Sequence, residues 1–203
     1  MLTFLSGLGA SSLHVISGPD HLAAVTPLAI DKRKNAWLVG LGWGIGHTLG
    51  ALIIGLLFFF FRDFIPLETL SGHSEQLVGF LLIAIGLWAL FRVFGMKKHS
   101  HHYRKGNSVL VALLIGTVHG ISGISHVFSI LPTLVLPSRL DAILFLTAYA
   151  LGTIVIMVTF AFLIGYLSYK TSEIKHETFF KILSTSGAVF AIGVGVVWIL
   201  LSF

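Results

Sequence analysis

Apolar stretches separated by short polar segments cover nearly the whole chain. A helix that crosses the hydrocarbon core of a membrane needs about 20 mostly apolar residues. Six stretches meet this length, at residues 3–29, 36–61, 76–95, 108–136, 140–168 and 179–202. The pattern therefore predicts an all-α membrane protein with six transmembrane helices.

The composition supports this prediction and excludes several classes of protein. Hydrophobic residues make up 56% of the 203 residues and charged residues only 10%, and the mean hydropathy is +0.96. Soluble domains carry about 25% charged residues, so a soluble enzyme, a nucleic-acid binder and a disordered scaffold are excluded. We expect the lipid bilayer as a partner and no nucleic acid. The absence of cysteine excludes thiolate metal sites and disulfides.

The distribution of Lys and Arg predicts the orientation, because loops rich in these residues stay on the cytoplasmic side. One side of the predicted bundle carries only Arg62 and Arg139. The other carries Lys32, Arg33, Lys34, Arg92, Lys97, Lys98, Arg104, Lys105, Lys170, Lys175 and Lys181. We expect a multi-pass protein of the cell inner (plasma) membrane with both termini outside the cytoplasm. The start lacks a basic region and a cleavage site, so we expect no removable signal peptide.

Two similar octets indicate an internal repeat. Residues 14–21 read HVISGPDH and residues 119–126 read HGISGISH, with five of eight positions matching at an offset of 105. Each octet lies halfway along the first long segment of its half. The chain thus divides into a first three-helix repeat (1–95), a cytoplasmic His-rich loop (96–107) and a second three-helix repeat (108–203). Because three is odd, the repeats would have opposite orientations, as in many secondary transporters.

The first helix of each half is expected to be interrupted within its octet. An unbroken helix over residues 3–29 would be about 40 Å long, more than the roughly 30 Å core. Gly18 and Pro19 provide a break in the first half, because proline lacks an N–H and clashes with the preceding turn. Gly120 and Gly123 are the weaker breakers of the second half. The alternative is a tilted or kinked helix without a site.

Six ionisable residues lie near the middle of predicted spans. Such residues are costly at that depth and usually carry function. They are His14, Asp20, His21, His47, His119 and His126. Imidazole and carboxylate together suit Ni²⁺, Co²⁺ or Zn²⁺, so we expect a metal pathway, with a proton pathway or satisfied core histidines as the alternatives. On an unbroken helix, His14 and His21 would be about 10.5 Å apart along the axis. The sequence leaves open whether His14 is a ligand or a separate relay.

Two further features lie near this set. Gly42, Gly46 and Gly50 form a small-residue stripe around His47, and such stripes let helices approach closely. We expect the stripe to bring His47 against the first span. Separately, the predicted cytoplasmic loop contains His99, His101 and His102. Short His-rich tracts often bind metal, and the alternative is a flexible basic loop that only fixes the topology.

The segment HVISGPDHLAAV resembles the signature of the nickel/cobalt transporter (NicO) superfamily, whose first motif pairs a His with a downstream Asp-His. Its GPDHLAA part is similar to short members related to urease-accessory-type membrane proteins. The resemblance implies nickel or cobalt transport, with His14, Asp20 and His21 handling the metal. The family usually has four residues between the His and the Asp-His, whereas this chain has five, residues 15–19.

These features predict transport of a divalent metal ion, which is a substrate and not a permanent cofactor. Export in exchange for protons is favoured, because the histidine loop could gather metal from the cytoplasm. Imidazole binds metal only when deprotonated, so a proton-rich exterior would favour release. The alternatives are an uptake permease, an intramembrane metalloenzyme, and a proton or anion pathway. We expect no enzyme, because an HExxH motif and a second central acid are lacking.

Overall fold

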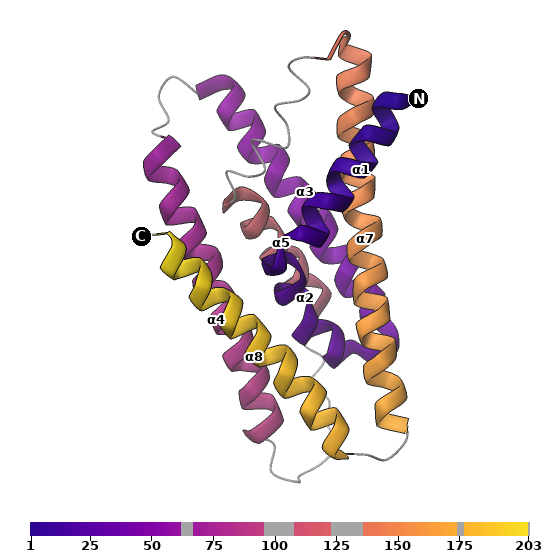
Figure 1. Ribbon diagram of the computed structural model, residues 1–203, viewed down its shortest axis with the longest axis vertical. Helices are drawn as coiled ribbons and strands as arrows, with labels where there is room; N and C mark the ends of the chain where they lie inside the picture. Colours follow the sequence, from indigo (N-terminus) through magenta and orange to yellow (C-terminus); the bar gives the residue numbers. More distant parts are fainter. Residues whose placement is uncertain (62–66, 96–107, 123–135, 174–176, 203) are drawn as a thin grey trace.

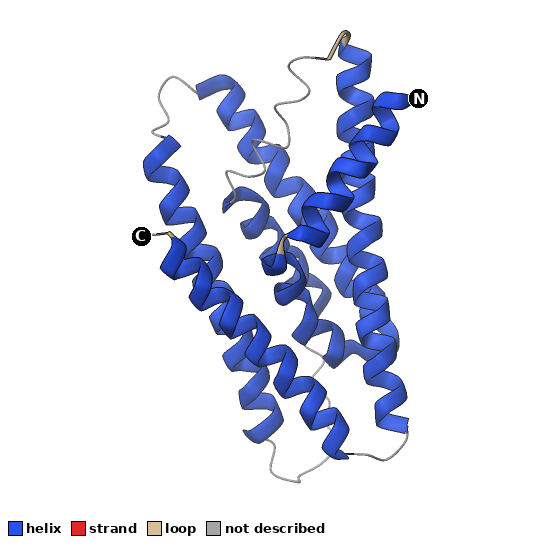
Figure 2. Ribbon diagram, viewed as in Figure 1, coloured by secondary structure: helices blue, strands red, loops and turns tan. Residues whose placement is uncertain are grey.

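The regular structure of the described part of the chain is entirely helical (Figure 2). The computed structural model describes residues 1–61, 67–95, 108–122, 136–173 and 177–202. Its elements are α1 (Leu2–Ser17), α2 (Pro19–Lys32), the 3₁₀ turn η1 (Arg33–Asn35), α3 (Ala36–Phe61), α4 (Leu67–Gly95), α5 (Ser108–Ser122), α7 (Arg139–Glu173) and α8 (Glu177–Leu201). The all-α prediction is confirmed for these residues.

Four helical stretches in the described residues are long and apolar enough to cross a membrane. They are Pro19–Leu56, Gln76–Phe94, Arg139–Thr171 and Thr178–Leu201. The first of these comprises α2, η1 and most of α3. Helices α1 and α5 are shorter apolar helices. Figure 1 shows α3, α4, α7 and α8 running along the length of the molecule. Helices α4 and α8 pack on each other, as do α3 and α7, and α2 contacts both pairs from between them.

The first apolar segment is divided into two helices at Gly18. The backbone of Gly18 is extended (φ −90°, ψ 96°), and its N–H donates to the carbonyl of His14 to close α1. Pro19 then opens α2 as its first residue, a position where its missing N–H costs nothing and its fixed φ already suits a helix. The interruption predicted at Gly18 and Pro19 is therefore present.

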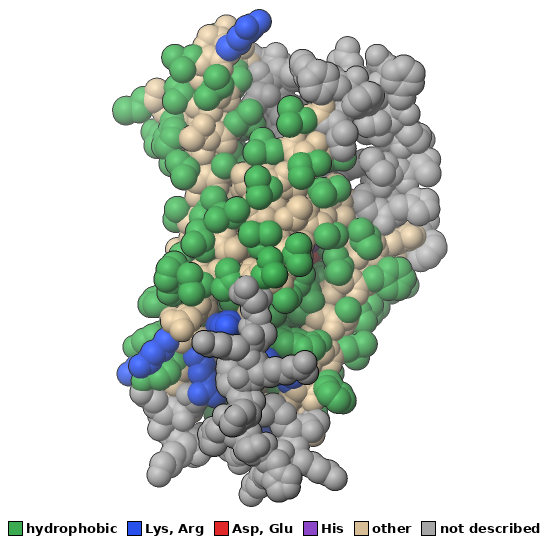
Figure 3. Space-filling view, turned by 180° about the vertical axis from the view of Figure 1, so that it is seen from behind, with side chains coloured by type: hydrophobic (Ala, Val, Ile, Leu, Met, Phe, Trp, Pro, Cys, Tyr) green, Lys and Arg blue, Asp and Glu red, His purple; other side chains and the backbone are tan. Residues whose placement is uncertain are grey.

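The chain reverses direction after α2. Arg33 has a positive φ of 52°, the one such non-glycine residue in the part described, and α3 begins three residues later and runs back along the molecule (Figure 1). At the same end, Arg92 in the last turn of α4 pairs with Asp31 in α2 at 2.9 Å. Figure 3 shows most of the visible Lys and Arg side chains gathered towards this end.

Helices α3 and α5 approach each other until their backbones touch. A Cβ added to Gly46 or Gly50 would meet the carbonyl of Leu113 or Thr117 on α5, and one added to Gly42 would lie 2.8 Å from the carbonyl of Val109. The glycine stripe of α3 therefore packs against α5 and not against the first span. The expectation that the stripe packs on the first span was wrong, because α5 has glycines of its own, Gly116 and Gly120, at this contact. His47 itself does lie against the first span, with its ring centroid 5.3 Å from that of His21.

The outer surface of the bundle is largely apolar. Exposed large hydrophobic side chains occur on α1, α3, α4, α5, α7 and α8, whereas the described side chains of α2 include none. The space-filling view is covered with hydrophobic groups between its two ends (Figure 3). Beneath them, Val15, Val39, Trp43 and Met157 are fully buried in one core cluster. Such an outer surface is compatible with contact to a lipid bilayer.

Candidate metal centre

Five ionisable side chains from four helices converge inside the bundle, and we call them the histidine cluster. His14 lies in the last turn of α1, Asp20 and His21 in the first turn of α2, His47 in α3 and His119 near the end of α5. His14 is half-buried, and the other four are buried. These four have relative exposures of 1–8%, so their polar atoms need partners inside the bundle.

The break at Gly18 is what brings the two ends of the first octet together. The ring centroids of His14 and His21 lie 4.8 Å apart, less than half of the roughly 10.5 Å rise of an unbroken helix. The N–H of His21 donates to the carbonyl of Gly18 at 3.2 Å. A side chain at position 18 would collide with the His21 ring, since an added Cβ would come within 2.5 Å of its Cε1. Glycine is therefore required here for a close approach.

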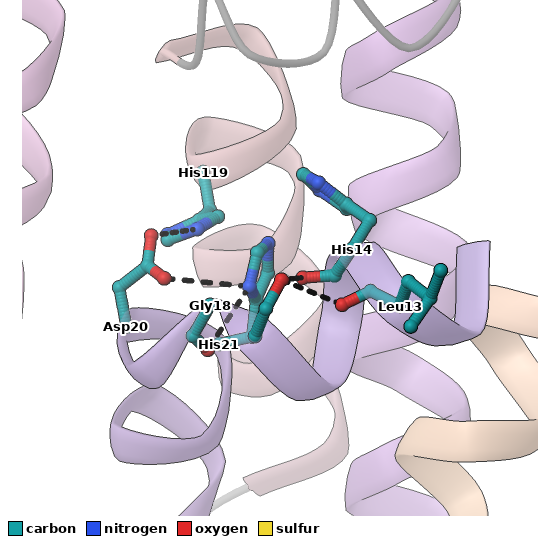
Figure 4. A network of polar contacts seen from close by, with 7 residues as sticks. Leu13, His14, Gly18, Asp20, His21 and His119 are labelled. Carbon is teal, nitrogen blue, oxygen red and sulfur yellow. Dashed lines mark hydrogen bonds and ion pairs between the residues drawn. The ribbon is translucent and has the colours of Figure 1, made fainter. Parts of the chain in front are cut away.

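Asp20 joins two histidines from different halves of the chain (Figure 4). Its Oδ2 lies 3.1 Å from Nε2 of His119, and its Oδ1 lies 3.3 Å from Nδ1 of His21. The same Nδ1 is 3.2 Å from the carbonyl oxygen of Gly18. Asp20 also lies in the first turn of α2, where the helix dipole favours a negative charge.

His47 places a third helix against the same rings. Its ring centroid is 5.3 Å from that of His21, 6.1 Å from that of His14 and 5.7 Å from that of His119. The indole of Trp43 stacks on His47 at 4.7 Å and 11°. Trp43 was not singled out from the sequence, although its spacing of four residues from His47 places both on one face of α3.

A second aromatic residue missed by sequence reasoning is Tyr149 on α7. Its ring centroid lies 6.0 Å from that of His14. Tyr149 lies 135 residues away from His14 in the sequence, and no local pattern links the two. Helix α7 thus contributes to the wall of the histidine cluster beside α1.

Two groups of three side chains in the described part of the chain have the geometry to hold a metal ion. Within each group, one ligand atom from each residue lies within 4.8 Å of the others. The groups are His14, His21 and His47, and Asp20, His21 and His119. His21 belongs to both groups. Five of the six predicted mid-span residues are therefore brought together.

The remaining predicted site residues have different outcomes. His126, Gly123 and the loop histidines His99, His101 and His102 lie outside the described residues. Gly120 lies inside α5 and does not interrupt it within the described range. An added Cβ there would meet the carbonyl of His47. Gly120 thus serves close packing of α5 on α3 and is not itself a helix break.

The fold and the cluster define a class of protein, in which apolar helices of membrane-spanning length enclose buried histidines and an aspartate. The chain is 30% identical over 190 residues to the urease accessory protein UreH of Bacillus sp. (strain TB-90), covering 86% of this chain and 82% of UreH. The chain belongs to the family of this urease accessory protein.

Two plant proteins are also similar to the chain. They are the chloroplast proteins FOR GROWTH AND FERTILITY 2 and 1 of Arabidopsis thaliana, 31% identical over 210 and 208 residues. The alignments cover 98% and 94% of this chain but 56% of each plant protein, so the chain spans about half of their length. No family model and no solved structure matches the chain.

Proposed function

We propose that this protein transports a divalent transition metal ion across a membrane through the histidine cluster. The observation that carries the proposal is the convergence of four histidines and one aspartate from α1, α2, α3 and α5 in the interior of an apolar bundle. Ionisable groups at such depth are rare and usually mark a substrate or ion pathway. We propose transport without a catalytic step.

The chemistry of the donors favours nickel, cobalt or zinc as the substrate. Imidazole with a carboxylate suits these borderline ions, whereas a soft Cu(I) site would use thiolate or thioether ligands, and the chain has no Cys and three Met. The resemblance of the first octet to nickel/cobalt transporters supports the first two metals. Membership of a family that includes a urease accessory protein supports nickel.

We also propose that the two halves form an inverted repeat with six membrane crossings. The offset of 105 that aligns the octets places α1 on α5 and α3 within α7. The contacts between the halves follow the same correspondence. Helix α1 packs along α7, and its counterpart α5 packs along α3, the counterpart of α7. His14 and His119, which are equivalent under this offset, both enter the histidine cluster. Such a pair of repeats could rock about the site and open it to each side in turn.

Metal flux into liposomes tests the transport proposal. Purified protein reconstituted in vesicles that contain a fluorescent chelator should increase the entry of Co²⁺ or Ni²⁺ over empty vesicles. Asp20→Asn removes the charge of the cluster and should reduce the flux at least tenfold. Asp31→Asn is the matched control, because Asp31 lies in the same helix but pairs with Arg92 at its end. Absence of flux, or equal flux in both variants, contradicts the proposal.

For the direction, we propose export coupled to protons, with the histidine loop at the cytoplasmic face as the collector. A metal-sensitive host that expresses the protein should survive better and contain less nickel and cobalt. Substituting His99, His101 and His102 together should reduce this effect without abolishing it. A rise in internal metal would instead identify an uptake permease.

The proposed orientation places both termini outside the cytoplasm of a plasma-membrane protein. The chain contains no cysteine, so single-cysteine variants can be labelled without background. A cysteine replacing His101 should react with an impermeant maleimide only after the cells are opened. Labelling of this position in intact cells would reverse the orientation.

A further inference from the structure

The histidine cluster could hold a metal in two ways that assign opposite roles to Asp20. In the group of Asp20, His21 and His119, the carboxylate would bind the metal directly. In the group of His14, His21 and His47, the metal would have three imidazole ligands. The hydrogen bonds of His21 distinguish these two arrangements.

Nδ1 of His21 faces two oxygen atoms that can only accept a hydrogen bond. One is the backbone carbonyl of Gly18 at 3.2 Å, and the other is Oδ1 of Asp20 at 3.3 Å. A neutral imidazole carries its proton on one nitrogen and a lone pair on the other. The two acceptors therefore fix the proton on Nδ1 and the lone pair on Nε2. In Figure 4, the second nitrogen of this ring points away from Gly18 and Asp20.

Asp20 is occupied in the same manner by His119. Its Oδ2 lies 3.1 Å from Nε2 of His119, which places an N–H donor on that carboxylate oxygen as well. A metal bound by Asp20, Nδ1 of His21 and Nε2 of His119 would have to displace both protons and break the contact to Gly18. A metal bound through Nε2 of His21 leaves all of these contacts in place.

We infer that His14, His21 and His47 form a three-histidine metal site, and that Asp20 is a positioning residue which orients His21 and is not a ligand. This inference rests on the proposed function. Metal-binding histidines usually donate their other N–H to a carboxylate or a backbone carbonyl, which fixes the ring and strengthens the ligand. His21 has both partners.

A site of this kind suits an ion that must enter and leave. Three protein ligands leave a coordination position open for water or for an exchanging ligand. His14 is the half-buried member of the three, whereas His21 and His47 are buried. The buried charge of Asp20 then stabilises the cation without a direct bond that would slow its release.

X-ray absorption spectroscopy of the full-length protein loaded with Co²⁺ alone tests the inference on the wild type. The expected first shell contains three imidazoles, recognised by the scattering of their outer ring atoms. A shell of two imidazoles and a carboxylate oxygen would overturn the inference. A wild-type protein that binds no Co²⁺ would instead overturn the proposed function, and binding without flux in vesicles would do the same.

Three variants extend the test with measured Co²⁺ affinities. Asp20→Asn should keep three imidazoles and weaken binding by about 10- to 100-fold, the usual effect of losing an outer hydrogen-bond partner. His119→Gln should also keep three imidazoles. The matched change His47→Gln should leave two imidazoles and weaken binding more than Asp20→Asn does. Loss of an imidazole in His119→Gln, with none lost in His47→Gln, would overturn the three-histidine site.

Discussion

The contact between α3 and α5 should be intolerant of a single added methyl group at Gly120. A Cβ at this position would meet the carbonyl oxygen of His47 and would lie 2.9 Å from the nitrogen of Ala51. Both are backbone atoms, so relief requires the two helices to separate. Overpacking of this kind costs about 1–3 kcal/mol. The same separation would move His47 away from His119, its neighbour in the histidine cluster.

Thermal unfolding of purified Gly120→Ala in a single detergent measures this cost. For a chain of this size, about 2 kcal/mol corresponds to a decrease of about 4–8 °C in Tm. Gly9→Ala and Gly193→Ala are the matched controls, because an added Cβ at either position has nothing within 4 Å. They should be neutral or stabilising by up to about 1 kcal/mol, since alanine is the better helix former. A Tm for Gly120→Ala equal to that of the controls would refute the packing argument.

Three further predictions follow from the site and its surroundings. Affinity for Co²⁺ should fall as the pH is lowered, because imidazole binds metal only when deprotonated and protons compete with Co²⁺ for the ring nitrogens; an affinity that does not change with pH would argue against imidazole ligands. Arg92→Ala should lower stability by less than about 1 kcal/mol, because its partly exposed pair with Asp31 is screened by solvent, and should leave Co²⁺ affinity unchanged; a larger loss would show that the pair holds α2 to α4. Co²⁺ should quench tryptophan fluorescence in the wild type much more than in Trp43→Phe, because Trp43 stacks on His47 at 4.7 Å; equal quenching would place the metal elsewhere.

Sequence reasoning recovered most of the residues that converge at the candidate site. His14, Asp20, His21, His47 and His119 are conspicuous because ionisable groups are rare in apolar helices. Trp43 and Tyr149 were missed, because aromatic residues are ordinary in such helices and only their contact with imidazoles distinguishes them. The sequence placed Asp20 among the metal-handling residues by its chemical type, whereas the positioning role that we propose for it rests on its contacts with His21 and His119.

The sequence alone determined the features that depend on local chemistry. Runs of apolar residues indicated where helices form, and Gly18 with Pro19 indicated the break, because these two residues act on their own backbone. The tertiary structure decided which faces meet. Helix α3 is apolar around most of its circumference, so its sequence could not show that Gly46 and Gly50 pack on α5. Likewise, the proton position on His21 depends on the acceptors that surround its ring, and only the folded chain brings these together.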